Sequence, residues 1–128
     1  MAESIISKKN YNFANRIVKL EKFLRKQHGE TIISKQLFRS GTSIGANVAE
    51  AAFAQSDADF ISKHQIALKE ANESRYWIRL LHDNDYLNDE MFESLTTDLN
   101  ELLSILVSII NSMKNKSKHL ETSSDFNS

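Results

Sequence analysis

The 128-residue sequence contains no cysteine and no proline, and only three of its residues are glycine. Without cysteine the chain has no disulfide, no thiolate nucleophile and no cysteine-ligated zinc, which excludes disulfide-rich secreted scaffolds and zinc fingers. Turns in β-proteins rely on proline and glycine, whereas long helices exclude both residues from their interiors. The composition therefore predicts an all-α protein in a reducing, cytoplasmic setting.

Long apolar runs are also missing. No stretch approaches the roughly 20 apolar residues that a membrane-spanning helix needs, and residues 1–10 (MAESIISKKN) lack the apolar segment of a signal peptide. The hydrophobic share of 41% is ordinary for a globular domain. We expect a single soluble domain that stays inside the cell.

The net charge is only −1, but the two signs are separated along the chain. Residues 1–40 carry nine Lys/Arg against three Asp/Glu, whereas residues 41–113 carry four against twelve. Either the basic segment binds an anionic partner, or basic and acidic helices attract one another within or between subunits. We favour the second interpretation.

Hydrophobic periodicity predicts four helices, over residues 10–27, 32–54, 57–82 and 88–114. The clearest is the last, where apolar residues alternate at spacings of three and four in the seam Phe92, Leu95, Leu99, Leu102, Leu106, Ile109 and Met113. Ser56 and Asn88 are the predicted N-caps of the third and fourth helices. Short connections favour an antiparallel up-down-up-down four-helix bundle over residues 10–116. A flexible N-terminus (1–9) and a disordered tail (117–128) would flank it.

Residues 41–45 (GTSIG) fit two incompatible motifs. As G-x-S-x-G they resemble the turn that presents a nucleophilic serine in hydrolases, and as G-x-x-x-G they resemble a helix face on which a second helix packs closely. The serine motif needs a preceding strand, and the surrounding pattern is helical. Two glycines inside a helix cost about 2 kcal/mol relative to alanine, so we expect close packing of a neighbouring helix to offset them. Ser43 is then a polar side chain in a helix interface.

Several blocks of the sequence resemble a known family. They are Gln36, the run RSGTSIGANVAEA over residues 39–51, Asp59-Phe60, and the run IALKEA over 66–71 with Glu73 and Tyr76-Trp77. These blocks are similar to the bacterial four-helix bundle proteins called 23S rRNA intervening sequence proteins. The resemblance implies an antiparallel bundle that assembles into homopentamers. It also implies kinship with the accessory variability determinant of diversity-generating retroelements, which binds nucleic acid and a reverse transcriptase.

The sequence departs from the family pattern at Ser40-Gly41, where many relatives have small or branched apolar residues, and at Ala51, where they often have glycine. Its net charge of −1 also contrasts with the strongly basic nucleic-acid-binding relative. The residues expected to support close helix packing and to form the family signature are Gln36, Arg39, Gly41, Ser43, Gly45, Asn47 and Glu50.

The third helix carries a second face that a simple bundle does not need to bury. Its members are Ile66, Glu70, Glu73, Trp77 and Leu80. We interpret it as a subunit interface, because aromatic anchors often supply binding energy. Alternatively, Trp77 covers the edge of the core. Glu70 and Glu73 are also expected to form a buried ion-pair network with Arg39, Arg75 and Glu50, in which the arginines pair with the carboxylates, rather than to act in catalysis.

A basic stripe lies opposite the apolar face of the first helix, formed by Arg16, Lys19, Lys22 and Lys26. It is a candidate nucleic-acid contact, with a solvated helix face as the ordinary alternative. The four histidines lack metal-ligand spacing, so no metal, cofactor or catalytic residue is predicted. The sequence predicts a non-enzymatic, self-associating bundle that acts as a nucleic-acid-associated accessory protein. The alternative is a protein-protein interaction scaffold without nucleic-acid binding.

Overall fold

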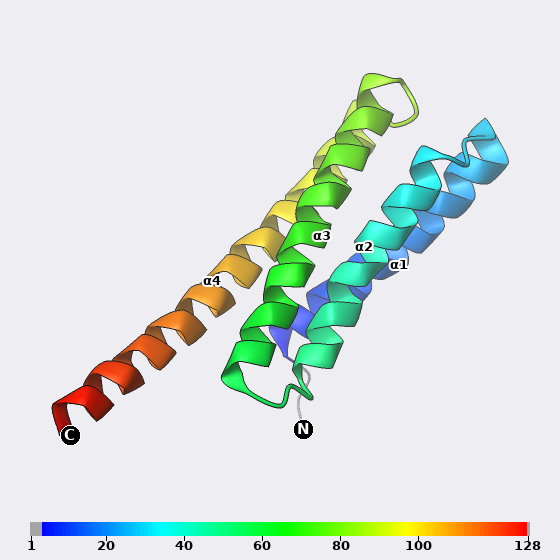
Figure 1. The fold of residues 1–128 in the computed structure, drawn as a ribbon. Coiled ribbons are helices and arrows are strands. Elements are labelled where there is room, and N and C mark those ends of the chain that lie inside the picture. Colours follow the sequence, from blue (N-terminus) through cyan, green and yellow to red (C-terminus); the bar gives the residue numbers. More distant parts are fainter. Residues whose placement is uncertain (1–3, 128) are drawn as a thin grey trace.

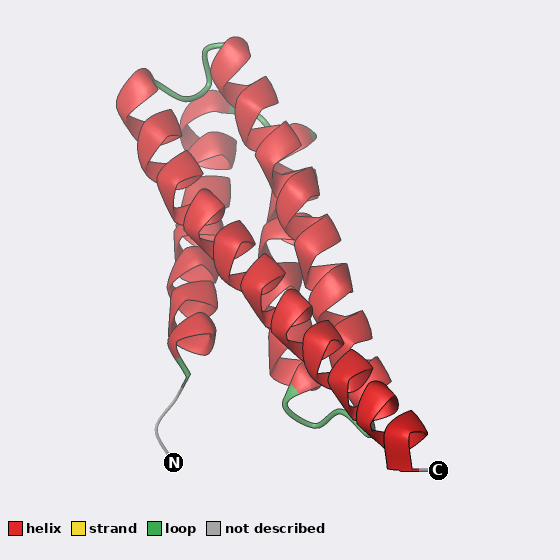
Figure 2. Ribbon diagram, turned by 90° about the vertical axis from the view of Figure 1, so that its left-hand side faces the viewer, coloured by secondary structure: helices red, strands yellow, loops and turns green. Residues whose placement is uncertain are grey.

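The computed structural model describes residues 4–127, with the side chains of residues 4–116 and 118. It contains four helices: α1 (Ile5–His28), α2 (Ile33–Ala51), α3 (Asp57–Asp83) and α4 (Asp89–Asn127). Each helix packs against its neighbours in the chain, and α4 also packs, less extensively, against α1. Figure 1 shows consecutive helices running in opposite directions, and Figure 2 shows the loops confined to the ends of the bundle. The predicted all-α four-helix bundle is confirmed.

The core consists of the apolar strips that the periodicity indicated. Leu95, Leu99, Leu102 and Leu106 of the predicted α4 seam are buried, while Phe92, Ile109 and Met113 at its two ends are partly exposed. The other helices contribute the buried side chains Phe13, Ile17, Leu20, Leu24, Leu37, Ile44, Val48, Ala67, Ala71, Ile78 and Leu81. Burying a leucine or isoleucine side chain contributes about 1.5–3 kcal/mol, so these strips are the main source of stability.

Several helix ends follow the predicted caps. The Ser56 Oγ accepts a hydrogen bond from the Asp59 N–H at 3.1 Å, and the Asn88 Oδ1 accepts one from the Met91 N–H at 2.8 Å. The break between the first two helices lies where the sequence indicated it, because Gly29 adopts the left-handed backbone conformation (φ 63°) that ends α1.

Two helices differ from their predicted bounds near the N-terminal half of the chain. α1 begins at Ile5 rather than at residue 10, because the Ser4 Oγ accepts a hydrogen bond from the Ser7 N–H and caps it earlier. Residues 5–9 are therefore helical rather than flexible, while residues 1–3 lie outside the described residues. α2 ends at Ala51 rather than 54, because the N–H groups of Phe53 and Ala54 bond three residues back and tighten the chain into a turn.

α4 is longer than predicted. It continues to Asn127, past the predicted end at residue 114 and through most of the tail predicted to be disordered; residue 128 lies outside the described residues. Residues 89–127 contain no glycine and no proline, the two residues that most strongly disfavour a helix interior. Figure 1 shows the last turns of α4 extending away from the other three helices.

Candidate interaction surfaces

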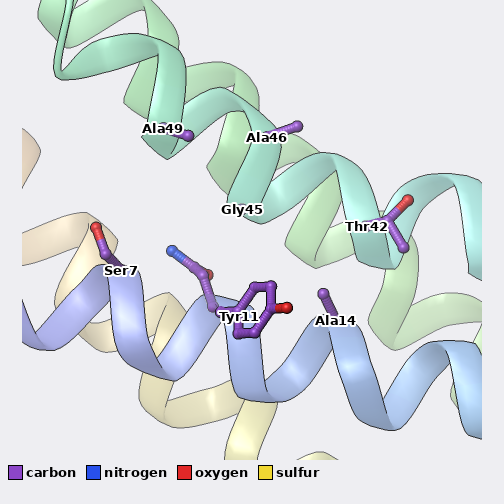
Figure 3. A pocket seen from close by; sticks show the side chains of 8 residues that line it. Ser7, Tyr11, Ala14, Thr42, Gly45, Ala46 and Ala49 are labelled. Carbon is purple, nitrogen blue, oxygen red and sulfur yellow. The ribbon is translucent and has the colours of Figure 1, made fainter. Parts of the chain in front are cut away.

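The GTSIG segment is part of the continuous helix α2, and its two glycines face α1. A Cβ atom added to Gly41 would lie 2.9 Å from the Cγ1 of Ile17, and one added to Gly45 would lie 3.3 Å from the Cβ of Asn10. Both distances are short for carbon contacts, so α1 and α2 pack closely here, and the contact at Gly41 leaves less room for a methyl group than the contact at Gly45. Figure 3 shows the two helices side by side at Gly45.

The polar side chains of α2 face α3 and solvent. The Ser74 Oγ of α3 donates a hydrogen bond to the Ser40 Oγ at 2.9 Å, and both residues are completely buried. The Ser43 Oγ donates to the Arg39 carbonyl at 2.7 Å, and the Asn47 side chain donates to the Ser43 carbonyl at 2.8 Å. The Ser43 hydroxyl is thus bound to its own helix, while Gln36 is exposed.

Ion pairs join α2 to α3, but they lie on the surface rather than in the interior. The Arg39 guanidinium lies 3.2 Å from a Glu70 carboxylate oxygen and also donates to Glu73. The Arg39 side chain is 48% exposed, so the expectation of buried pairs was wrong. The reason is geometric: Glu70 and Glu73 lie on the outer face of α3, and the long arginine side chain reaches them across the surface. Arg75 is exposed and has no ion pair within the described residues.

Glu50 forms a second link between the same two helices. Its carboxylate lies 3.0 Å from the Lys63 ammonium. The hydrogen bond from Lys63 to Glu50, together with the Glu50 charge, raises the pKa of Lys63. Glu50 therefore pairs with a lysine on α3 instead of with Arg39 or Arg75.

The outer face of α3 combines exposed and half-buried apolar groups. Ile66 is 39% exposed and Tyr76 is 60% exposed, whereas Trp77 and Leu80 are partly buried. Trp77 packs against the core as well as against the Tyr76 ring, with ring centroids 5.0 Å apart. Its indole Nε1 is buried and has no hydrogen-bond partner among the residues that the structure describes. Trp77 thus covers the edge of the core, as the alternative interpretation expected, and it also contacts the exposed Tyr76, whereas Ile66 lies about three turns earlier on α3.

The residues of the basic stripe on α1 have two different environments in the fold. The Arg16 guanidinium lies 2.6 Å from the Asp98 carboxylate and 2.9 Å from the Ser94 hydroxyl, both on α4. The Lys9 ammonium lies 2.5 Å from the Glu101 carboxylate on the same helix. Lys19, Lys22 and Lys26 are exposed and have no ion pair in the part of the chain that the structure describes. Arg16 therefore serves the α1–α4 contact, and only the three lysines face solvent without a counterion.

Among the described residues, no group of three histidine, aspartate or glutamate side chains is placed to hold a metal ion. His64 is buried with its Nδ1 2.8 Å from the Phe60 carbonyl, and the His82 Nε2 lies 2.7 Å from the Asp89 carboxylate. No described helix has both the length and the apolar character that crossing a membrane requires.

Comparisons with known proteins agree with this architecture. The profile of the family described as 23S rRNA-intervening sequence protein matches residues 2–108. Among solved structures, a protein of unknown function from the S23 ribosomal protein family of Bacteroides thetaiotaomicron is 52% identical to the chain, with a TM-score of 0.82. The match covers 83% of this chain and 98% of the other. The comparison with curated proteins found no match.

Proposed function

The chain belongs to the 23S rRNA-intervening sequence protein family, and from this premise we propose that it is a non-enzymatic bundle that self-associates through the outer face of α3. The observation that carries the proposal is the presence of large exposed apolar side chains along the outer face of α3: Tyr76 against the partly buried Trp77, and Ile66 about three turns earlier on the helix. Aromatic groups at the centre of a contact supply a large share of binding energy. The homopentamer implied by the family resemblance is the assembly we propose.

The bonding of Ser43 supports the non-enzymatic part of this proposal. A serine nucleophile needs a base within hydrogen-bonding reach of its hydroxyl, whereas the Ser43 Oγ donates to the Arg39 carbonyl of its own helix. Within the described residues, no histidine or carboxylate is bonded to it. We propose that this family signature stabilises a helix contact and does not perform chemistry.

Light scattering with matched variants tests the α3 interface. The wild-type protein is expected to have five times the 14.6 kDa mass of one chain. Ile66→Glu introduces a charge into the proposed contact and should yield folded, helical subunits of lower mass. Val107→Glu on α4 is the control, because Val107 is 42% exposed against 39% for Ile66, and its mass should not change. A monomeric wild type, or an Ile66→Glu variant of unchanged mass, would contradict the proposal.

A second candidate function is nucleic-acid binding by Lys19, Lys22 and Lys26, which lack intramolecular counterions within the described residues. Three phosphate contacts predict that the affinity for a nucleic acid falls roughly 20- to 40-fold between about 50 and 200 mM salt, because counterion release scales with the number of contacts. Replacing the three lysines with methionine should abolish this dependence. Absence of binding at about 50 mM salt would leave the protein-interaction scaffold as the function.

A further inference from the structure

The exposed lysines of α1 flank an aromatic ring that does not belong to the basic stripe itself. Phe23 follows Lys19 by four residues and precedes Lys26 by three, so the three side chains lie on one face of the helix. Phe23 is 37% exposed, and both lysines are exposed and form no ion pair within the described residues. This face of α1 therefore presents an aromatic surface between two ammonium groups without counterions.

A pocket of about 270 Å³ lies beside Phe23, between α1 and α4. Its apolar lining consists of Leu20, Phe23, Met91 and Leu95, and its charged lining consists of Arg16 and Lys19. The Arg16 guanidinium lies 2.6 Å from the Asp98 carboxylate, which neutralises its charge. Lys19 therefore supplies the uncompensated charge of the lining, and the rest of the pocket offers an apolar surface next to the exposed ring.

Phe23 also belongs to an aromatic cluster at one end of the bundle. Its ring centroid lies 5.2 Å from that of His28, and the His28 centroid lies 5.8 Å from that of Tyr86, both in edge-to-face contacts. Tyr86 lies in the loop between α3 and α4, which Figure 1 shows at the same end of the bundle as the end of α1. These contacts restrain the exposed Phe23 ring, which lowers the conformational entropy that it would lose on binding a ligand.

We propose that this surface binds single-stranded nucleic acid, with an unpaired base stacked on Phe23 and the neighbouring phosphates bound by Lys19 and Lys26. The unpaired ammonium groups favour an anionic ligand, and the exposed ring beside an apolar pocket favours one that also offers a flat apolar face. A single strand offers both, because its bases are free to stack on aromatic side chains while its phosphates contact a basic surface. The proposal rests on the nucleic-acid binding proposed for the lysines and adds to it the recognition of an unpaired base.

Fluorescence anisotropy with two labelled oligomers tests the stacking in the full-length protein, at about 50 mM salt. A short oligothymidylate and an abasic phosphodiester oligomer of the same length carry the same charge, but only the first has bases. We expect the wild type to bind the oligothymidylate roughly 5- to 150-fold more tightly than the abasic oligomer, which is the contribution of one base stacked on an aromatic side chain. This comparison needs no variant, so it does not depend on the folding of any substituted protein.

Substitutions of Phe23 then assign the stacking to this ring. Phe23→Leu keeps an apolar side chain beside the pocket but removes the aromatic face, so its affinity for the oligothymidylate should fall to that for the abasic oligomer. Phe23→Tyr keeps the aromatic face and should bind the oligothymidylate as the wild type does. Phe38→Leu on α2 is the matched control, because Phe38 is 39% exposed, and it should leave both affinities unchanged.

The possible results separate base stacking from phosphate binding. Equal binding of the two oligomers by the wild type, or equal oligothymidylate binding by the wild type and Phe23→Leu, would overturn the stacking but not the phosphate contacts of the lysines. Absence of binding by both oligomers would overturn nucleic-acid binding as a whole. Polyglutamate of equal charge that binds as tightly as the oligothymidylate would overturn the proposal in favour of an acidic protein partner.

Discussion

At the scale of single residues, the corner between α1 and α2 depends on the buried carboxylate of Glu30. It accepts hydrogen bonds from the backbone N–H groups of Ile32, Ile33 and Ser34, at 3.0, 2.8 and 2.7 Å. Burial raises the pKa of Glu30, but the hydrogen bonds from Ile33, Ser34 and Ile32 outweigh it, so the pKa lies below its usual value of 4.5. The carboxylate neutralises the positive end of α2 and satisfies three otherwise unpaired donors.

Glu30→Gln should lower the free energy of unfolding at pH 7 by about 1–2 kcal/mol, because the amide keeps only one acceptor atom for these donors. A lowered folded-state pKa means that the stabilisation is complete above the unfolded pKa and is lost as the pH falls through the folded pKa. Urea titrations between pH 7 and 3 should therefore show the difference between the two proteins shrinking below about pH 4.5. A constant difference across this range would refute the role of the ionised carboxylate.

Gly41 and Gly45 differ in how much space they leave, although the sequence presents them as equivalent. Gly41→Ala places a Cβ 2.9 Å from Ile17, whose side chain is 1% exposed and cannot move aside. Overpacking of a core typically costs about 1–3 kcal/mol, which equals or exceeds the gain of about 1 kcal/mol in helix propensity. Thermal unfolding should show Gly41→Ala to be less stable than both the wild type and the matched Gly45→Ala variant. If the two variants were equally stable, α1 and α2 would be able to move apart to accommodate the added methyl group at position 41, and the prediction would be wrong.

For single residues, the sequence patterns identified which positions have a structural role but not which groups they contact. The small side chains at positions 41 and 45 indicated close packing, and Gly29 marked the helix break. The capping role of Glu30 carried no recognisable signal, because glutamate is not a preferred N-cap residue, although its carboxylate accepts hydrogen bonds from N–H groups only two to four residues along the chain. The burial of Asn10 against Gly45 depends on the alignment of α1 against α2, which a single sequence does not encode in any short motif.

At the scale of helices, α1 and α4 are joined by opposite charges. Arg16 and Lys9 of α1 pair with Asp98 and Glu101 of α4. These side chains are partly exposed, so each pair is worth about 0.2–1 kcal/mol and is weakened by salt. These ion pairs add to the stability that the buried leucine seam of α4 provides, and they do not substitute for it.

Arg16→Met and Lys19→Met separate structural from binding roles within the basic stripe. Arg16→Met removes the contacts with Asp98 and Ser94 and should lower the free energy of unfolding by about 0.2–1 kcal/mol. Lys19→Met removes no ion pair within the described residues and should leave stability unchanged, but it should weaken nucleic-acid binding. Chemical denaturation and a binding titration on both variants check this. The assignment fails if Lys19→Met is the less stable protein.

Helix positions were largely predictable because each apolar strip repeats at helical spacing over several turns. The heptad seam between Leu95 and Leu106 is the strongest example. Helix ends were less predictable. The extent of α4 was underestimated because the polar composition of the tail was taken as a sign that the helix ends, although the tail contains no glycine or proline. The pairing of Arg16 with Asp98 was anticipated only as a general attraction between basic and acidic segments, since the neighbours of a helix are set by the whole fold.

At the scale of the whole molecule, the faces that the bundle leaves uncovered carry the function that we propose. The outer face of α3 was predicted from its second apolar stripe, which a single bundle has no need to bury. Its detailed composition differs from the expectation, because Glu70 and Glu73 are occupied by Arg39 of the same chain. The surface offered to another subunit therefore centres on Ile66, Tyr76 and the exposed edge of Trp77.

The proposed assembly is tested most directly by the emission of Trp77, the single tryptophan of the chain, measured as the protein is diluted. Self-association through the α3 face predicts that the emission maximum shifts to longer wavelength over the same concentration range in which the mass falls, because dissociation exposes the indole to water. An emission maximum that stays constant while the mass falls would place the contact elsewhere, and a mass of one chain at every concentration would contradict self-association itself.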